Sequence, residues 1–277
     1  MTSTSAESAA RATFENANWR SGARIVNASA DGDACCHLVE SGLIAGYAAI
    51  DGTKLACFGL KGPGTLIVSE RKPDWPEPLY LALTPVISLE VPSPEFARIM
   101  SRSPSLQDAY LAQVQDELTR IRQVAACNAH HTLVERCGHW LLHLHAYLGD
   151  TLPLTHAGLA ALLGVRRAGV TLTLKEFQKR NAIRQQRGII VVLDASLLRA
   201  CACSCPIDQP TQVDFRNLLA GAGASVGMAD GPRGWFEREV AVRIGNSSMG
   251  ESEWVRREVA LRICRSVITR GQALLAQ

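Results

Sequence analysis

Aromatic residues and long apolar runs are both scarce in this chain. Phe, Trp and Tyr make up only 5% of its 277 residues, although apolar residues make up 47%. No stretch approaches the roughly 18 consecutive apolar residues that a membrane-spanning helix needs. The apolar share is ordinary for a globular protein, which excludes wholesale disorder, and the length favours two domains over one.

A secretory signal is also lacking. Residues 1–8 carry neither the basic segment nor the apolar segment that such a signal needs. Nine cysteines in a chain without a signal indicate reduced thiols rather than a disulfide framework. We therefore expect a soluble cytoplasmic protein with no membrane partner.

Motifs of several enzyme classes are missing as well. The chain has no Gly-x-x-x-x-Gly-Lys-Ser/Thr phosphate loop and no His-Glu-x-x-His zinc motif. It also has no carboxylate pair set among apolar residues of the kind that general acid and base catalysis uses. The sequence therefore predicts that the chain is not an enzyme.

The net charge of +3 conceals one strongly basic segment. Residues 1–100 carry eight basic side chains against eleven acidic ones. Residues 166–187, in contrast, carry seven basic side chains against Glu176 alone, which gives a local net charge of +6. This segment suggests a polyanion as the partner, and a solvated basic face is the alternative.

The first hundred residues have the pattern of a small β domain. Residues 1–18 are small and polar, and we expect them to be poorly ordered. Beyond them, short apolar runs alternate with turn signals such as Asp31-Gly32 and Asp51-Gly52. This pattern predicts strands at 36–39, 43–50, 55–60, 65–69 and 85–91, and an antiparallel barrel or sandwich over residues 19–100.

Two helices are expected next. Ser93 and Pro94 suit the N-cap and first position of a short helix, and Ser103-Pro104 begins a longer one. In the longer helix, apolar residues recur at alternating spacings of three and four: Leu111, Val114, Leu118, Ile121 and Ala125. This seam predicts self-association as a coiled coil, and packing of the helix on its own β domain is the alternative.

The following segment has the pattern of a winged helix-turn-helix. A helix is expected over residues 128–149, and Thr155 then caps a short helix that ends at Gly164. A second helix over residues 166–179 carries Val170, Leu174 and Phe177 at the spacing of a buried face. Two strands, 183–187 and 189–193, follow it through a basic turn.

From Ala125 to Cys205 the chain resembles the C-terminal half of the Crp/Fnr family of transcription regulators. The match is carried by Glu135-Arg136, Leu159-Ala160, Leu163-Gly164-Val165-Arg166-Arg167, Val170-Thr171-Leu172, Ile183–Ile189 and Ala202-Cys203-Ser204-Cys205. Residues 42–60 resemble, more weakly, the family's cyclic-nucleotide-binding-type β-roll. The resemblance implies an α+β fold with a β-roll at 19–100, a dimerisation helix at 101–127 and a winged helix-turn-helix at 128–205.

The resemblance also implies a sequence-specific, homodimeric regulator that binds near-palindromic double-stranded DNA, with RNA polymerase as a candidate further partner. Arg166 and Arg167 open the helix that would enter the major groove, and a guanidinium suits guanine. Lys175 and Thr171 would share its exposed face, whereas the remaining candidates suit phosphate contacts: Thr155, Arg184, Gln185 and Arg187.

Ala168-Gly169 departs from the family pattern, which commonly has a polar or acidic residue after the second arginine. Both residues remove potential base contacts, so no target sequence is carried over. The alternative function is a protein-interaction module derived from such a regulator, acting through the helix-turn-helix or the C-terminal tail.

Control by a cyclic nucleotide is not expected, and the sequence identifies no other effector. A cyclic-nucleotide site in this family has a Gly-Glu pair followed by Arg-Ser/Thr, but neither pair occurs between Lys61 and Leu89. We therefore predict no cyclic nucleotide and no cofactor.

Metal binding is also not expected. Cys201, Cys203 and Cys205 would share one side of an extended strand, which leaves metal or redox chemistry and simple packing both open. His139 and His143 have ligand-compatible spacing, but surface histidines are commoner.

Residues 206–277 lie outside the resemblance, and we expect a helical extension there. Residues 235–244 recur as 254–263, nineteen positions later, with seven of ten residues identical. The repeat predicts two short amphipathic helices, with no function assigned to them.

Overall fold

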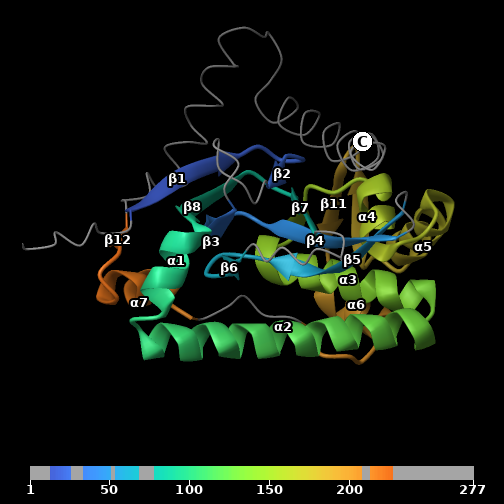
Figure 1. Cartoon of the computed structure of the whole chain (residues 1–277). Helices are drawn as coiled ribbons and strands as arrows, with labels where there is room; N and C mark the ends of the chain where they lie inside the picture. Colours follow the sequence, from blue (N-terminus) through green and yellow to red (C-terminus); the bar gives the residue numbers. More distant parts are fainter. Residues whose placement is uncertain (1–12, 26–33, 51–53, 69–77, 208–212, 227–277) are drawn as a thin grey trace, which may run out of the picture.

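The computed structural model describes residues 13–25, 34–50, 54–68, 78–207 and 213–226 (Figure 1). The strands are β1 Thr13–Trp19, β2 Arg24–Ile25, β3 Cys35–Ser41, β4 Ile44–Ile50, β5 Lys54–Lys61, β6 Leu66–Ile67, β7 Leu79–Ala82, β8 Val86–Pro92, β9 Thr151–Leu152, β10 Ile183–Gln186, β11 Ile189–Val192 and β12 Ser225–Val226. The helices are α1 Ser93–Met100, α2 Pro104–His130, α3 Leu133–Leu148, α4 His156–Leu163, α5 Arg167–Lys179, α6 Ala195–Cys201 and α7 Phe215–Gly221.

The N-terminal domain is a β-roll made of two sheets. Their strand orders are β12-β1-β8-β3-β6 and β2-β7-β4-β5. Apolar side chains such as Val39, Ile44 and Val86 pack together between them. Each of the five predicted strands is confirmed to within two residues at its ends.

The expectation that residues 1–18 are poorly ordered was wrong for residues 13–18. These residues belong to β1, which pairs antiparallel with β8 from Glu15 opposite Glu90 to Trp19 opposite Val86. The indole Nε1 of Trp19 donates a hydrogen bond of 3.0 Å to Ser88 Oγ on β8. The backbone ladder explains why small polar residues are ordered here, since strand pairing does not require large side chains. Residues 1–12 lie outside the described residues.

Residues 213–226, part of the expected helical extension, contain helix α7 and strand β12 and pack against the β-roll. Phe215 and Leu219 of α7 are fully buried against Phe96 and Leu106, and β12 pairs parallel with β1. In Figure 1, α7 and β12 accordingly lie beside the β-roll and not beyond the helix-turn-helix. The repeated segments 235–244 and 254–263 lie outside the described residues.

The end of this segment contains a motif-like sequence. Residues 223–227 spell Gly-Ala-Ser-Val-Gly, which fits the Gly-x-Ser-x-Gly motif of α/β-hydrolases. That motif places its serine on a sharp turn between a strand and a helix, whereas Ser225 lies within β12. Within the described residues, which end at Val226, Ser225 is therefore part of a strand and not of a turn.

The long helix α2 connects the two domains along one edge of the molecule (Figure 1). Ser103 caps it by accepting a hydrogen bond from the backbone N–H of Leu106. The helix continues to His130, so the next helix begins at Leu133 and not at the predicted residue 128. In α1, likewise, the N-cap is Pro92, and Ser93 is the first helical residue.

Polar side chains fasten α2 to the β-roll. The amide of Gln113 is buried, donates a hydrogen bond to the carbonyl of Leu66 and accepts one from its N–H, at 2.8 and 2.9 Å. The ammonium of Lys61, also buried, forms an ion pair with Glu117. Leu66 lies in β6 and Lys61 at the end of β5, so the turn between these strands is tied to the middle of α2.

No single helix among the described residues is long and apolar enough to cross a membrane. Helices α4 and α5 together pass that test by length and composition only, but the chain bends by 110° between them.

Candidate nucleic-acid interface

Helices α4 and α5 form the predicted helix-turn-helix. Thr155 caps α4, since its hydroxyl oxygen accepts a hydrogen bond of 3.0 Å from the N–H of Gly158. Gly164 ends α4 in the left-handed conformation, with φ of 64°, which glycine adopts without a steric penalty. The 110° bend then directs α5 away from α4, and Asn181 ends the following turn at φ of 58°.

Helix α3 supports this unit. Thr132 and Glu135 form a reciprocal capping box at its start, and the hydrogen bonds from Thr132 lower the pKa of the Glu135 carboxyl. Arg136 Nη2 donates a hydrogen bond of 2.6 Å to the carbonyl of Leu163 in the last turn of α4. These contacts fix α3 and α4 relative to each other.

The two faces of α5 differ sharply. Val170, Leu174 and Phe177 are fully buried, as predicted, and attach α5 to α3 and α4. Leu172 lies on the opposite face, where 68% of its surface is exposed to solvent. The sequence pattern did not single out Leu172, because a leucine in a helix usually belongs to the buried face.

Gly169 has a packing role that the sequence did not reveal. A Cβ atom at this position would lie 2.8 Å from Cδ2 of Leu133, so a residue larger than glycine would displace the end of that side chain at the start of α3. The expectation that Gly169 offers no base contact stays a prediction. Ala168, which is exposed, is the departure that affects the outer surface.

Most of the cationic side chains around α5 have no side-chain partner within the described part of the chain. Glu176, the acidic residue of the basic segment, pairs with Arg180 at 2.7 Å. Five predicted contact residues are exposed, and they make no ion pair or side-chain hydrogen bond with any described residue: Arg166, Arg167, Lys175, Arg184 and Arg187. Their charges are available to a ligand.

Thr171 and Gln185, two of the other predicted contact residues, take part in an internal network centred on His156. Its Nδ1 lies 2.9 Å from Thr171 Oγ1 on α5, and its Nε2 lies 2.7 Å from Gln185 Oε1 on β10. The amide nitrogen of Gln185 donates to Gln178 Oε1 at 2.9 Å, so the amide oxygen of Gln185 faces His156. Because an amide oxygen only accepts, the proton between these two groups lies on His156 Nε2. His156 therefore joins α4, α5 and the wing, a role that no local sequence pattern indicates.

The predicted seam of α2 lies on its solvent side. Leu111, Val114 and Leu118 are 56%, 40% and 44% exposed, Ala125 is exposed and Ile121 is half-buried. The buried residues of the same helix, such as Leu106 and Gln113, face the β-roll. The seam therefore contributes little to the packing of α2 within its own chain.

Comparison with protein families assigns the second domain. Residues 135–201 match the model of the Crp-like helix-turn-helix domain. The chain carries this Crp-like domain. No curated protein matches the chain in sequence.

Solved structures extend the likeness to the whole architecture. A Crp/Fnr-family transcriptional regulator of Thermus thermophilus has a TM-score of 0.55 at 22% identity, over 68% of this chain and 98% of its own. FixK2 of Bradyrhizobium japonicum has a TM-score of 0.58 at 14% identity, over 70% and 99%. A protein assigned to the Crp/Fnr family in Eubacterium rectale has 0.57 at 20% identity, over 68% and 89%. At these identities the likeness establishes the fold, which is of Crp/Fnr type.

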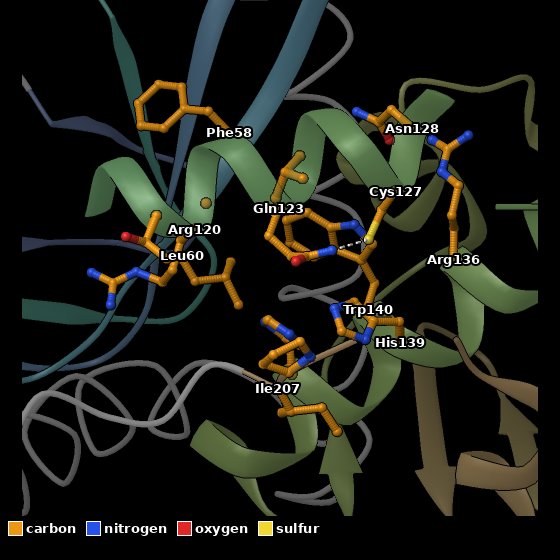
Figure 2. A pocket seen from close by; sticks show the side chains of 15 residues that line it. Phe58, Leu60, Arg120, Gln123, Cys127, Asn128, Arg136, His139, Trp140 and Ile207 are labelled. Atoms are coloured by element: carbon orange, nitrogen blue, oxygen red, sulfur yellow. Dashed lines mark hydrogen bonds between the residues drawn. The ribbon is translucent and has the colours of Figure 1, made fainter. Parts of the chain in front are cut away.

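A cavity of about 200 Å³ lies between the β-roll, α2 and the Crp-like domain (Figure 2). Leu60 comes from β5, Gln123 and Cys127 from α2, and His139 and Trp140 from α3. The lining is largely apolar.

Two histidines of α3, His139 and His143, line this cavity. The rings of His139 and His143 lie 4.4 Å apart. Burial lowers the pKa of His139, and it lowers the pKa of His143 to about 3. Both rings are therefore neutral at physiological pH. No third ligand-type side chain from the described ranges groups with them as a metal site.

Proposed function

We propose that the chain is a homodimeric, sequence-specific DNA-binding transcription regulator of the Crp/Fnr type. The observation that carries this proposal is the set of exposed cations around α5 and the wing that have no partner among the described residues. An arginine or lysine without an internal partner contributes little to folding, whereas it gains strongly from a phosphate or a guanine edge.

The roles follow from position. Arg166 and Arg167 lie at the N-terminal end of α5, the end from which a recognition helix contacts bases, and we assign them to base contacts together with Lys175. Arg184 and Arg187 lie on the wing and suit phosphates, and Thr155 presents the start of α4 to the backbone. The network of His156 holds Thr171 and Gln185, which we assign to orienting α5 against the wing.

Dimerisation places two such domains on one duplex. The exposed seam of α2 supplies the apolar surface, and an isologous pair of helices would present two recognition helices related by a two-fold axis. The target is therefore a near-palindrome with half-sites about 34–36 Å apart, one turn of the duplex.

Cyclic nucleotides are not expected to control the chain. The turn between β5 and β6 is occupied by contacts to α2 from Lys61 and from Leu66, in addition to lacking the Gly-Glu and Arg-Ser/Thr pairs. Calorimetry with cyclic AMP and cyclic GMP should give no binding heat, and micromolar affinity for either would contradict this part of the proposal.

Selection from a random pool of duplex DNA with the purified full chain tests the proposal as a whole. We expect enrichment of a two-fold symmetric motif, and loss of enrichment for the double variant R166A/R167A. The matched control is R199A, because Arg199 is an exposed arginine on α6, outside α5 and the wing. An unenriched pool with folded protein would contradict DNA reading.

A protein-interaction module is the second candidate, and exposed Leu172 is the observation that favours it. An apolar side chain at the centre of the outer face of α5 suits a protein surface as well as a thymine methyl group. L172A distinguishes the two, since in the DNA model it changes the preferred bases and leaves binding to random duplexes intact.

A further inference from the structure

Three thiols and one imidazole come together where the C-terminal end of α2 meets the segment after α6. The sulfurs of Cys127, Cys203 and Cys205 and a ring nitrogen of His131 all lie within 4.8 Å of one another. Cys127 and Cys203 are buried, and the other two are half-buried. The residues come from two segments more than 70 positions apart in the sequence.

The separations fit a single ion. Zn²⁺ binds thiolate sulfur at about 2.3 Å and imidazole nitrogen at about 2.0–2.1 Å in a tetrahedron, which places neighbouring ligand atoms about 3.5–3.8 Å apart. Cys127 Sγ lies 3.5 Å from Cys205 Sγ, and Cys205 Sγ lies 3.9 Å from His131 Nδ1. A two-iron cluster, in contrast, would need its ligands in two pairs on separate metal atoms.

The backbone presents two of these groups from one helix turn. Cys127 and His131 are four residues apart at the end of α2, so their side chains lie on the same side of it. His131 is the C-cap residue, and its N–H still donates to the carbonyl of Cys127 at 3.0 Å. The C-terminal end of a helix carries a partial negative charge, which favours a cation.

Surrounding polar groups suit metal-bound thiolates. Gln123 Nε2 donates to Cys127 Sγ at 3.3 Å and to Cys205 Sγ at 3.1 Å, and such outer contacts orient ligands. Figure 2 shows the hydrogen bond to Cys127. Three thiolates and a neutral imidazole leave one net negative charge on a Zn²⁺ centre, and Arg136, on the same cavity wall as Cys127, offsets it.

We propose that Cys127, His131, Cys203 and Cys205 bind one structural Zn²⁺ ion. With four protein ligands the site is closed, which is typical of structural rather than catalytic zinc. This differs from the sequence expectation that the chain binds no metal. Cys201, which the sequence grouped with Cys203 and Cys205, lies outside the cluster, and its sulfur accepts a hydrogen bond from Arg180.

The ion would fasten the segment leaving the Crp-like domain to the helix that carries the dimer seam. It would thereby fix the orientation of α5 relative to α2, and this consequence for DNA binding rests on the proposed function. The metal site itself does not, because metal content is measured without DNA. A chain that binds zinc but does not bind DNA would refute only the proposed function.

The test is metal analysis of the full chain, purified under reducing conditions without a polyhistidine tag. We expect about one zinc per chain, and after exchange with Co²⁺ the charge-transfer absorption of thiolate ligands in a tetrahedral site. C205S and H131A should weaken Zn²⁺ binding by at least roughly 100-fold in competition with a chelator, since each removes a direct ligand. H131C, which replaces one ligand type with another, should retain the ion.

The matched control is C201S, which changes a cysteine two positions from Cys203 without touching the cluster. It should keep a full equivalent of zinc. Two results would overturn the proposal: a reduced, folded chain that binds neither Zn²⁺ nor Co²⁺, or equal loss in C201S and C205S. A disulfide between Cys127 and Cys205 in a zinc-free chain would also overturn it, in favour of a redox role.

Discussion

The β-roll and the surface around α5 differ in whether their charged side chains have partners. In the β-roll, Lys61 pairs with Glu117 of α2, and Glu40 pairs with Arg216 of α7. Around α5, arginines such as Arg166 and Arg167 have no partner among the described residues. Burial explains the first pattern, because a buried charge without a partner costs several kcal/mol. Exposure permits the second, and this supports the DNA contacts proposed for these residues.

The same contrast runs along α2. One side of the helix is committed to its own chain through Leu106, Gln113 and Cys127. The other side carries leucines that touch little of it, Leu111 and Leu118 among them. The committed side holds the two domains together, and the exposed side carries the surface through which we propose that two copies associate.

The largest expected effect comes from substitutions in the exposed seam of α2. L118E/I121E should give a folded monomer, because a coiled-coil seam does not accommodate glutamates from both helices in its core. Without a second recognition helix, affinity for a palindromic site should fall by roughly 100-fold or more. Light scattering measures the first effect, and titration of a labelled duplex measures the second.

A112E/T119E is the matched control for this variant, since Ala112 and Thr119 are exposed residues of α2 that lie outside the seam. It adds the same number of negative charges to the same helix and should remain dimeric. If L118E/I121E is still a dimer, the seam is not the dimer interface.

The next effect concerns helix α7, which packs against the β-roll. F215A removes a fully buried ring from the cluster that contains Phe96 and Leu106, and we expect a loss of about 3–5 kcal/mol in the free energy of unfolding. L218A, at a half-buried position of the same helix, should cost clearly less. Urea unfolding measures both. Equal and small losses would mean that α7 is not part of the domain core.

A smaller effect separates the two kinds of arginine. R167A should lose about 1–3 kcal/mol of discrimination between specific and random DNA, as expected for one bidentate base contact. R184A should weaken both kinds of site alike and reduce the slope of affinity against salt by about one unit. Titrations of both duplexes at several salt concentrations distinguish the roles, and identical behaviour of the two variants would count against them.

Local signals explain what the sequence predicted well. The cap at Thr155, the left-handed Gly164 and the helical spacing of Val170 and Leu174 each act within a few residues. They identify a helix-turn-helix without knowledge of the rest of the chain. The cations were found for the same reason, because composition alone reveals a basic segment.

Contacts between distant segments explain what the sequence did not predict. β1 pairs with β12 across about 200 residues, and a pairing of two residues on each strand leaves no periodic pattern to detect. His156 becomes important only because α5 and the wing lie next to it. Cys203 and Cys205 belong to a dense cysteine run that the sequence shows, whereas no local pattern links that run to Cys127 and His131, more than 70 positions earlier. Their four-residue spacing at a helix end was the available signal.

The smallest expected effect concerns the N-terminal cap of α3, a helix of the Crp-like domain. T132A removes the hydroxyl that caps α3 and should cost about 1 kcal/mol in the free energy of unfolding. T119A is the control, because that hydroxyl donates to the carbonyl of Gln115 on the exposed surface of α2, and its loss should be nearly neutral. Equal costs for the two variants would show that the capping box does not stabilise the domain.

The partner of Thr132 adds a pH dependence to the same test. Hydrogen bonds from Thr132 hold the pKa of Glu135 below its ordinary value, so this carboxylate stabilises the fold above the unfolded-state pKa of about 4.3. As the pH falls through the lower folded-state pKa, the carboxylate is protonated in both states and that contribution disappears. The stability difference between the unmodified chain and E135Q should therefore be present at neutral pH and shrink toward zero in acid. A difference that stays constant with pH would mean that the charge on Glu135 does not matter, and that only the shape of the cap does.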